Sequence, residues 1–180
     1  MQKYRCSLFI LITSFFIVSC TTKVMTVQEV MDKVVTQLYK TTSAEDLKKL
    51  DNETVMKLFS PEDLKSLATQ HWSFDVNVPV VVSVMRSAKQ KVVPFWLSES
   101  GFQKTDLTMK NEQTIYEVWQ KSFKAGHVGL GVNGFDQELG MHYFVSVAPQ
   151  NTEDQLTLSH FFPENQFAGT LDNGAFTYHD

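Results

Sequence analysis

Cysteine is almost absent from this sequence of 180 residues, which contains only Cys6 and Cys20. Both lie near the N-terminus, so residues 21–180 contain no thiol. That stretch can form no internal disulfide framework, no thiol nucleophile and no zinc site with cysteine ligands. Its stability must come from packing, and 43% hydrophobic residues are enough for a core.

Arginine is equally scarce, and the chain is acidic. The only arginines are Arg5 and Arg86, and the sequence pI is about 5.7. Bidentate binding of phosphate groups relies mainly on arginine, and nucleic-acid-binding domains are usually basic. The composition therefore argues against a nucleic-acid partner and against a phosphate-cradling surface.

Long apolar runs are missing except at the N-terminus. Residues 8–18 are apolar apart from Thr13 and Ser14, and they follow the charged residues Lys3 and Arg5. This order predicts a secretory signal peptide, which is too short for a stable membrane-spanning helix. Without this leader the chain keeps 14 of its 16 basic residues against 20 acidic ones, a formal net charge of -6.

The end of the leader, Ile17–Cys20, resembles the lipobox of bacterial lipoproteins: an aliphatic residue, a tolerant position, a small residue and the lipidated cysteine. The resemblance implies a signal peptide over residues 1–19, lipid attachment at Cys20 and a tether over residues 20–26. Several acyl chains, at about 0.8 kcal/mol per buried CH₂, would anchor the protein stably. Thr21 resembles signals for the outer membrane, so we expect a lipid-anchored protein of the bacterial cell envelope. The alternative is an ordinary cleaved signal peptide with an incidental cysteine.

The first part of the mature chain contains repeated helix-start signals. Thr26–Glu29, Ser43–Asp46 and Ser60–Asp63 each pair a serine or threonine with acidic residues, and Pro61 suits a first helical position. Apolar residues at helical spacing follow, and residues 52–59 are expected to add another turn or two. Such short helices need a partner surface, so we expect this helical arm, residues 27–71, to pack on the sheet that follows. A free arm that binds a partner is the alternative.

From Trp72 onward the apolar residues recur at every second position, as far as Val84, and Pro79 implies an edge or a bend. Further strand-like runs, separated by turn-forming residues, are Val92–Leu97, Phe102–Met109, Ile115–Phe123, His127–Val132 and Met141–Val147. Short strands at this spacing, with no helix between them, predict a mainly β fold. We expect an antiparallel β-sandwich of the immunoglobulin or fibronectin type over residues 72–150, preceded by the short N-terminal helical segment. Residues 151–180 have less pattern and are expected to be a C-terminal extension, or a linker to a domain outside the sequence.

The segment Gly129–Gly134 matches G-x-G-x-x-G, but its context does not fit a dinucleotide site. That site needs a helix after the loop, because the helix N-terminus holds the pyrophosphate. Here Val128, Leu130 and Val132 alternate through the glycines, and a second strand is expected from Met141. We therefore interpret Asn133–Gly134 as a hairpin turn.

The histidines form no recognised metal-binding or catalytic spacing. They are His71, His127, His142, His160 and His179. His127 and His142 would approach each other if their strands were neighbours, whereas scattered histidines are usually surface or core residues. The sequence also contains no G-x-S-x-G elbow and no P-loop. We therefore predict no catalytic, cofactor-binding or metal-binding residue in this chain.

Trp96 and Trp119 are the candidate ligand residues. With Phe95, Phe102, Tyr116 and Tyr143 they would provide a stacking surface for sugars or peptides if they were exposed. Aromatic residues within strands more often pack in the core or pair across strands.

Several blocks of sequence together resemble one protein family. They are residues 74–80, 83–86, 93–97, 116–121, 131–135 and 143–147. Over roughly residues 60–180 the chain is similar to the N-terminal region of bacterial lipoproteins of the purple acid phosphatase-like, calcineurin-like metallophosphoesterase family. In that family a fibronectin-like β domain precedes a phosphoesterase domain whose two metal ions clamp the reacting oxygens.

The resemblance implies a division of labour. The family's metal ligands come from D-x-H, G-D-x-x-Y, G-N-H-[DE] and H-x-H motifs, and none of these occurs here. No catalytic residue is therefore carried over to this sequence, and the dinuclear metal is implied for a downstream phosphoesterase domain. We expect a noncatalytic, membrane-anchored module that positions that domain, and the ending Thr177–Asp180 favours the front end of a longer enzyme.

Other interpretations remain open from the residues. The chain could instead be a stand-alone surface lipoprotein that binds glycan or protein through exposed aromatic residues. A small enzyme with a site around His127 and His142 is the third possibility. The sequence leaves the ligand, the oligomeric state and the orientation at the membrane open.

Overall fold

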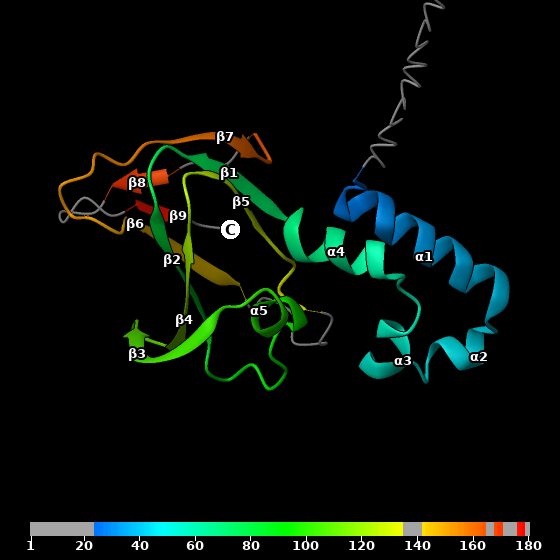
Figure 1. Ribbon diagram of the computed structural model, residues 1–180. Coiled ribbons are helices and arrows are strands. Elements are labelled where there is room, and N and C mark those ends of the chain that lie inside the picture. The colour runs from blue at the N-terminus through cyan, green and yellow to red at the C-terminus, as the bar shows by residue number, and fades with distance from the viewer. Residues whose placement is uncertain (1–23, 135–141, 165–167, 171–175, 179–180) are drawn as a thin grey trace, which may run out of the picture.

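The computed structural model describes residues 24–134, 142–164, 168–170 and 176–178. They form a helical arm, on the right in Figure 1, beside a body of strands on the left. The predicted fold class is confirmed: the described chain is mainly β, with antiparallel sheets packed as a sandwich and a short helical segment before them.

The helices of the arm begin at side-chain caps. They are α1 (Val27–Thr41), α2 (Ala44–Leu47), α3 (Asn52–Met56) and α4 (Pro61–Thr69). The predicted starts are confirmed, because Thr26 and Ser60 form capping boxes before α1 and α4, and Ser43 caps α2. These caps bind backbone N–H groups that have no acceptor within the first helical turn.

The strands form two sheets in the described part of the chain. One sheet has the order β5–β1–β7, and the other has the order β3–β4–β2–β6–β9–β8. The strand pairings among the described residues are antiparallel. The strands are β1 (Trp72–Val76), β2 (Val80–Ser87), β3 (Gln103–Lys110), β4 (Ile115–Phe123), β5 (Gly126–Leu130), β6 (Tyr143–Pro149), β7 (Leu158–Phe162), β8 (Ala168–Thr170) and β9 (Phe176–Tyr178), with helix α5 (Phe95–Glu99) between β2 and β3.

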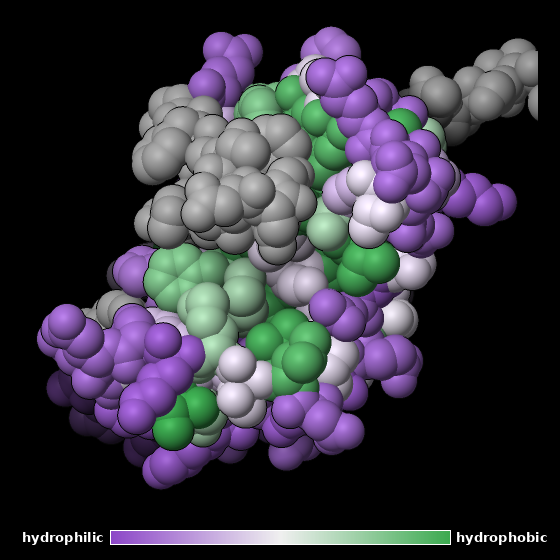
Figure 2. Space-filling model, turned by 90° about the vertical axis from the view of Figure 1, so that its left-hand side faces the viewer, coloured by the Kyte–Doolittle hydropathy of each residue, from purple (hydrophilic) through white to green (hydrophobic). Residues whose placement is uncertain are grey.

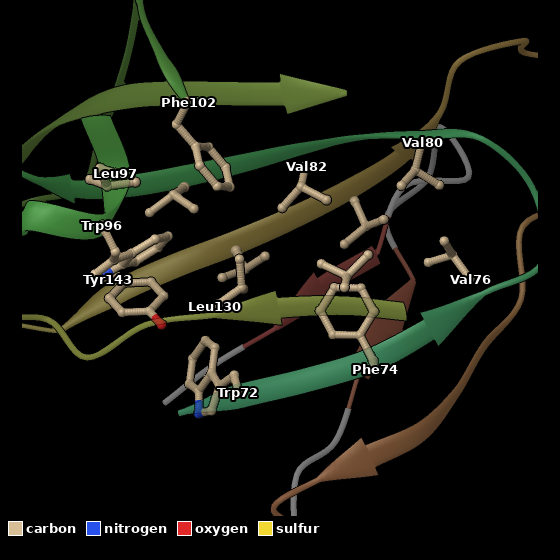
Figure 3. Packing of buried hydrophobic residues seen from close by; sticks show 14 of the residues in the cluster. Trp72, Phe74, Val76, Val80, Val82, Trp96, Leu97, Phe102, Leu130 and Tyr143 are labelled. Carbon is tan, nitrogen blue, oxygen red and sulfur yellow. The ribbon is translucent and has the colours of Figure 1, made fainter. Parts of the chain in front are cut away.

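The core lies between the two sheets. Alternate residues of β1 and β2 point into it, as the spacing of two predicts, and Figure 3 shows them facing side chains from β5, β6 and α5. Its largest fully buried side chains include Trp72, Phe74, Trp96 and Tyr143. The buried members of this cluster are Trp72, Phe74, Val76, Val80, Val82, Val84, Trp96, Leu97, Phe102, Val128, Leu130, Tyr143, Val145, Val147 and Leu156.

The apolar run that begins at Trp72 is divided between the two sheets. β1 and β2 belong to different sheets, and Pro79 lies where the chain passes from one to the other. A proline suits this position, because it cannot donate a backbone hydrogen bond to a sheet. The expected bend at Pro79 is confirmed.

Two sequence-based boundaries need correction. The run Val92–Leu97 was expected to be a strand, but Phe95–Glu99 forms helix α5, whose Trp96 and Leu97 are buried. A short apolar run fits either structure, so its periodicity did not distinguish them. The sandwich also extends beyond residue 150, since β7 pairs with β1 and β9 pairs with β6.

Candidate functional site

The glycine-rich segment 129–134 is the place where the arm, α5 and both sheets meet. The Val132 N–H donates to the Leu67 carbonyl of α4 at 2.9 Å, and the Trp96 indole N–H donates to the Val132 carbonyl at 2.7 Å. The Tyr143 hydroxyl of β6 donates to the Gly131 carbonyl at 2.7 Å. We call Gly129–Asn133, with these partners, the junction.

The glycines of the junction allow this close approach. A Cβ on Gly131 would lie 2.5 Å from Cδ1 of Trp96 and 2.8 Å from Cα of Ala68. A Cβ on Gly129 would lie 2.5 Å from the Thr69 carbonyl oxygen. Both distances are far below van der Waals contact, so the glycines are explained by the packing of α4 and Trp96 against β5.

The hairpin interpretation of Asn133–Gly134 was wrong. β5, which precedes this pair, belongs to the sheet of β1, whereas β6 belongs to the sheet of β2. The segment therefore connects two sheets instead of joining two neighbouring strands. Gly134 does have a positive φ of 125°, as a glycine-favouring position requires.

The arm is held against the sandwich at the junction. Its own apolar cluster contains Val30 and Val34 of α1 together with Phe59 and Leu67, and Phe95 and Val132 of the sandwich pack against it. The ammonium group of Lys33 on α1 lies 2.6 Å from the buried carboxylate of Asp63 on α4. The expectation that the helices pack on the following sheet is confirmed for α4, which lies close to β5 because Gly129 has no side chain there. Helix α1 packs on α4.

A cluster of polar residues lies on the opposite side of the β5–β1–β7 sheet from the core. His127 of β5 is paired with Asp75 of β1, and their Nδ1 and Oδ1 atoms are 2.9 Å apart. Nδ1 of His160 lies 3.0 Å from the other carboxylate oxygen of Asp75. His160 has a φ of 51°, a left-handed conformation, where the register of β1 and β7 shifts.

The contacts of the Asp75 carboxyl group with the two histidines favour its ionised form. The hydrogen bond from His127 lowers the pKa of Asp75 most; burial raises this pKa, but the hydrogen bond from His160 also lowers it, and the pKa lies below its ordinary value. Both histidines are well exposed, with 59% and 81% of their side-chain surfaces accessible. Within the described ranges, no group of three or more His, Cys, Asp or Glu side chains is arranged to hold a metal ion.

The sequence-based pairing of histidines was wrong. His127 and His142 were expected to approach if their strands were neighbours, but β5 and β6 lie in different sheets. His127 instead shares Asp75 with His160, and sequence reasoning missed Asp75 altogether. His71 stacks on Trp72, with ring centroids 5.8 Å apart, and His179 lies outside the described residues.

The two candidate ligand tryptophans do not form an exposed surface together. Trp96 is 1% exposed and donates to the Val132 carbonyl, so its place on a ligand surface is corrected to a place in the core. Trp119 is half-buried, and its indole N–H donates to the carboxylate of Glu117 at 2.9 Å. Burial of the apolar indole explains both positions.

A buried ion pair lies beside Trp119 and includes Glu117. The guanidinium of Arg86, 2% exposed, is hydrogen-bonded to the Glu117 carboxylate and to the Val92 carbonyl. Lys104 adds a second cation, 2.5 Å from Glu117. Burial raises the pKa of Glu117, but hydrogen bonds from Lys104, Trp119 and Arg86 outweigh this and hold the pKa below its ordinary value.

An apolar cluster also lies on the outer face of the larger sheet. Met85, Tyr116 and Val118 are buried there, and Met109 and Phe144 pack against them. Figure 2, which shows the face at the left of Figure 1, has apolar residues between hydrophilic borders. The structure identifies no partner for this face.

The remaining sequence expectations concern the leader and the identity of the chain. Cys20 lies outside the described residues. No helix in the described part of the chain is both long and apolar enough to cross a membrane. When the chain is compared with models of protein families, with curated proteins and with solved structures, none of them matches it.

Proposed function

We propose that this chain is the lipid-anchored, noncatalytic N-terminal module of a purple acid phosphatase-like metallophosphoesterase. In this role it holds the downstream phosphoesterase domain, with its dinuclear metal, at the membrane of the bacterial envelope. Cys20 carries the lipid, and the sandwich provides the platform for the domain.

The junction is the observation that carries the proposal. A module that positions another domain must hold that domain at a fixed place relative to the membrane anchor. Its own parts must therefore be packed rigidly against each other. Here α1 packs on α4, and the Leu67 carbonyl of α4 accepts a hydrogen bond from Val132 beside β5. The path from α1 through α4 to the sandwich is therefore continuous and packed.

The resemblance to the phosphoesterase lipoproteins supports the identity of the partner. Its blocks coincide with the elements that build the sandwich: residues 74–80 and 83–86 lie in and around β1 and β2, and residues 143–147 lie in β6. The block at residues 131–135 begins within the junction. The resemblance thus covers the residues on which the platform depends.

The reading frame beyond Asp180 tests the partner. We expect D-x-H and G-N-H motifs downstream in the same frame. A stop codon directly after Asp180 would contradict the proposal and would favour a stand-alone surface lipoprotein that binds glycan or protein.

An activity assay tests the noncatalytic role. Residues 21–180, purified and supplied with Mn²⁺ or Zn²⁺, should hydrolyse a generic phosphomonoester no faster than a sample without protein. Robust turnover would contradict the proposal. Loss of that turnover in a variant that combines H127A and H160A would then locate a catalytic site at the cluster around Asp75.

A further inference from the structure

The chain between Cys20 and the first described residue is short. Val24 follows Cys20 by four residues, and an extended chain covers at most about 3.6 Å per residue, or roughly 14 Å in total. Helix α1 then begins at Val27. A lipid on Cys20 therefore restricts which face of the protein can lie beside the bilayer.

The surface around the start of α1 is concave and carries apolar side chains among polar ones. A pocket of about 350 Å³ is lined by residues from three separate parts of the chain: Thr26–Gln28, Gln70–His71 and Phe162–Pro163. Phe162, with 42% of its surface accessible, lines this pocket, and Val24, with 50% accessible, precedes the lining residue Thr26 by two positions in the chain. We call Val24, Val27, Phe162 and Pro163 the tether-proximal surface.

Glu29 and Asp75 near this surface are engaged in other contacts, whereas Glu164, which follows Pro163, is exposed. The Glu29 carboxylate accepts a hydrogen bond from the Thr26 N–H at 2.8 Å, as part of the capping box. Asp75, on the neighbouring sheet face, lies between His127 and His160. The apolar side chains of the tether-proximal surface suit the interfacial region of a bilayer, in which neighbouring polar side chains such as Gln28, Gln70 and Glu164 stay hydrated.

We propose that the tether-proximal surface rests on the lipid bilayer, with Val24 and Phe162 in the interfacial region. This inference rests on the proposed lipid anchor at Cys20. In Figure 1 the end of β7 and the start of α1 lie at the upper side of the molecule, whereas β3 lies at the lower side. The β3 edge then faces away from the membrane.

Depth-dependent quenching tests this orientation. A fluorescent amino acid is introduced by codon suppression in place of Phe162, or in place of Leu107 on β3, which is 58% exposed and serves as the matched control. The acylated full chain is reconstituted in vesicles of phosphatidylethanolamine and phosphatidylglycerol that contain spin-labelled lipid. We expect quenching at position 162 to be at least threefold stronger than at position 107.

Equal quenching at the two positions, or stronger quenching at position 107, would overturn the inference. Mass spectrometry of the N-terminal peptide separates this failure from failure of the proposed function, because it reports acylation of Cys20 directly. If Cys20 is unmodified, the proposed anchor fails. In a C6A variant the remaining Cys20 thiol is then joined chemically to a maleimide phospholipid, and the same comparison of positions 162 and 107 decides the orientation.

Discussion

At the scale of single residues, Glu117 balances the buried charge of Arg86. The Arg86 side chain is 3% exposed and that of Glu117 is 15% exposed, so neither charge is fully hydrated. Breaking a buried ion pair leaves an uncompensated charge, which costs more than the pair itself contributes. Arginine is scarce in the sequence, but the charge of Arg86 is buried and needs its partner Glu117.

We predict that E117Q destabilises the protein by about 3 kcal/mol, because Arg86 loses its counter-charge. Urea denaturation of the two proteins measures the difference. K104A is the matched control: Lys104 is 56% exposed, and its loss should cost less than about 1 kcal/mol. A cost for E117Q no larger than that of K104A would show that the pair is not important for stability.

The same pair predicts a pH dependence. The pKa of Glu117 is lower in the folded protein than its ordinary value of 4.5, so the folded state binds this proton less tightly than the unfolded state does. Its stabilising contribution is therefore complete well above pH 4.5 and is lost as the pH falls through the native pKa. The difference in unfolding free energy between wild type and E117Q should shrink below pH 4.5. A difference that stays constant from pH 6 to pH 3 would contradict this.

The second residue-scale prediction concerns the junction. Since a Cβ on Gly131 would overlap Trp96 and the backbone of Ala68, G131A should destabilise the protein by about 1–3 kcal/mol. K91A, at an exposed position, should change stability by less than about 0.5 kcal/mol. Thermal or urea unfolding measures both. A neutral G131A would mean that α4 and Trp96 do not pack closely on β5.

The polar cluster shows what sequence reasoning could not reach at this scale. Asp75 and His127 face each other because β1 pairs with β5 across 52 positions of sequence, and His160 joins them from β7. A single sequence gives the spacing of residues within a strand but not the partner of that strand. The prediction of a ligand surface at Trp96 and Trp119 was wrong for a related reason. Whether a tryptophan is buried or exposed depends on neighbours that a single sequence does not identify.

At the scale of elements, local chemistry predicted the helices well. The capping boxes at Thr26 and Ser60 and the cap at Ser43 mark the observed starts, because these signals act within one turn. The strand pattern also gave the core face of β1 and β2 correctly. The run before α5 was misassigned, and the strands after residue 150 were not expected, because both depend on packing against distant segments.

The caps allow a matched comparison. S60A removes the cap of α4, which buries Leu67 and Asp63, so we predict a cost of about 1 kcal/mol in unfolding free energy. S43A removes the cap of α2, a helix with no buried residue, and should cost only a few tenths of a kcal/mol. Urea denaturation of the two variants makes the comparison. Equal costs would show that α4 is no more important to the fold than α2.

At the scale of the whole molecule, the arm and the sandwich form one packed path, and the proposed anchor at Cys20 precedes it. The start of α1, at Thr26–Gln28, lines a pocket with Phe162 of β7, and the junction fixes the arm to the sandwich. The platform's role depends on a phosphoesterase domain and on a lipid at Cys20, both of which are proposals. Fractionation of cells tests the two together.

The most direct measurement is the distribution of phosphomonoesterase activity between membrane and soluble fractions of the cells that encode this chain. C20A, introduced at the chromosomal gene, should move the activity associated with this chain into the soluble fraction while leaving the total unchanged. C6A, which leaves the lipobox intact, should keep that activity in the membrane fraction. Activity that stays in the membrane in C20A, or that does not accompany this chain in either fraction, would contradict the account.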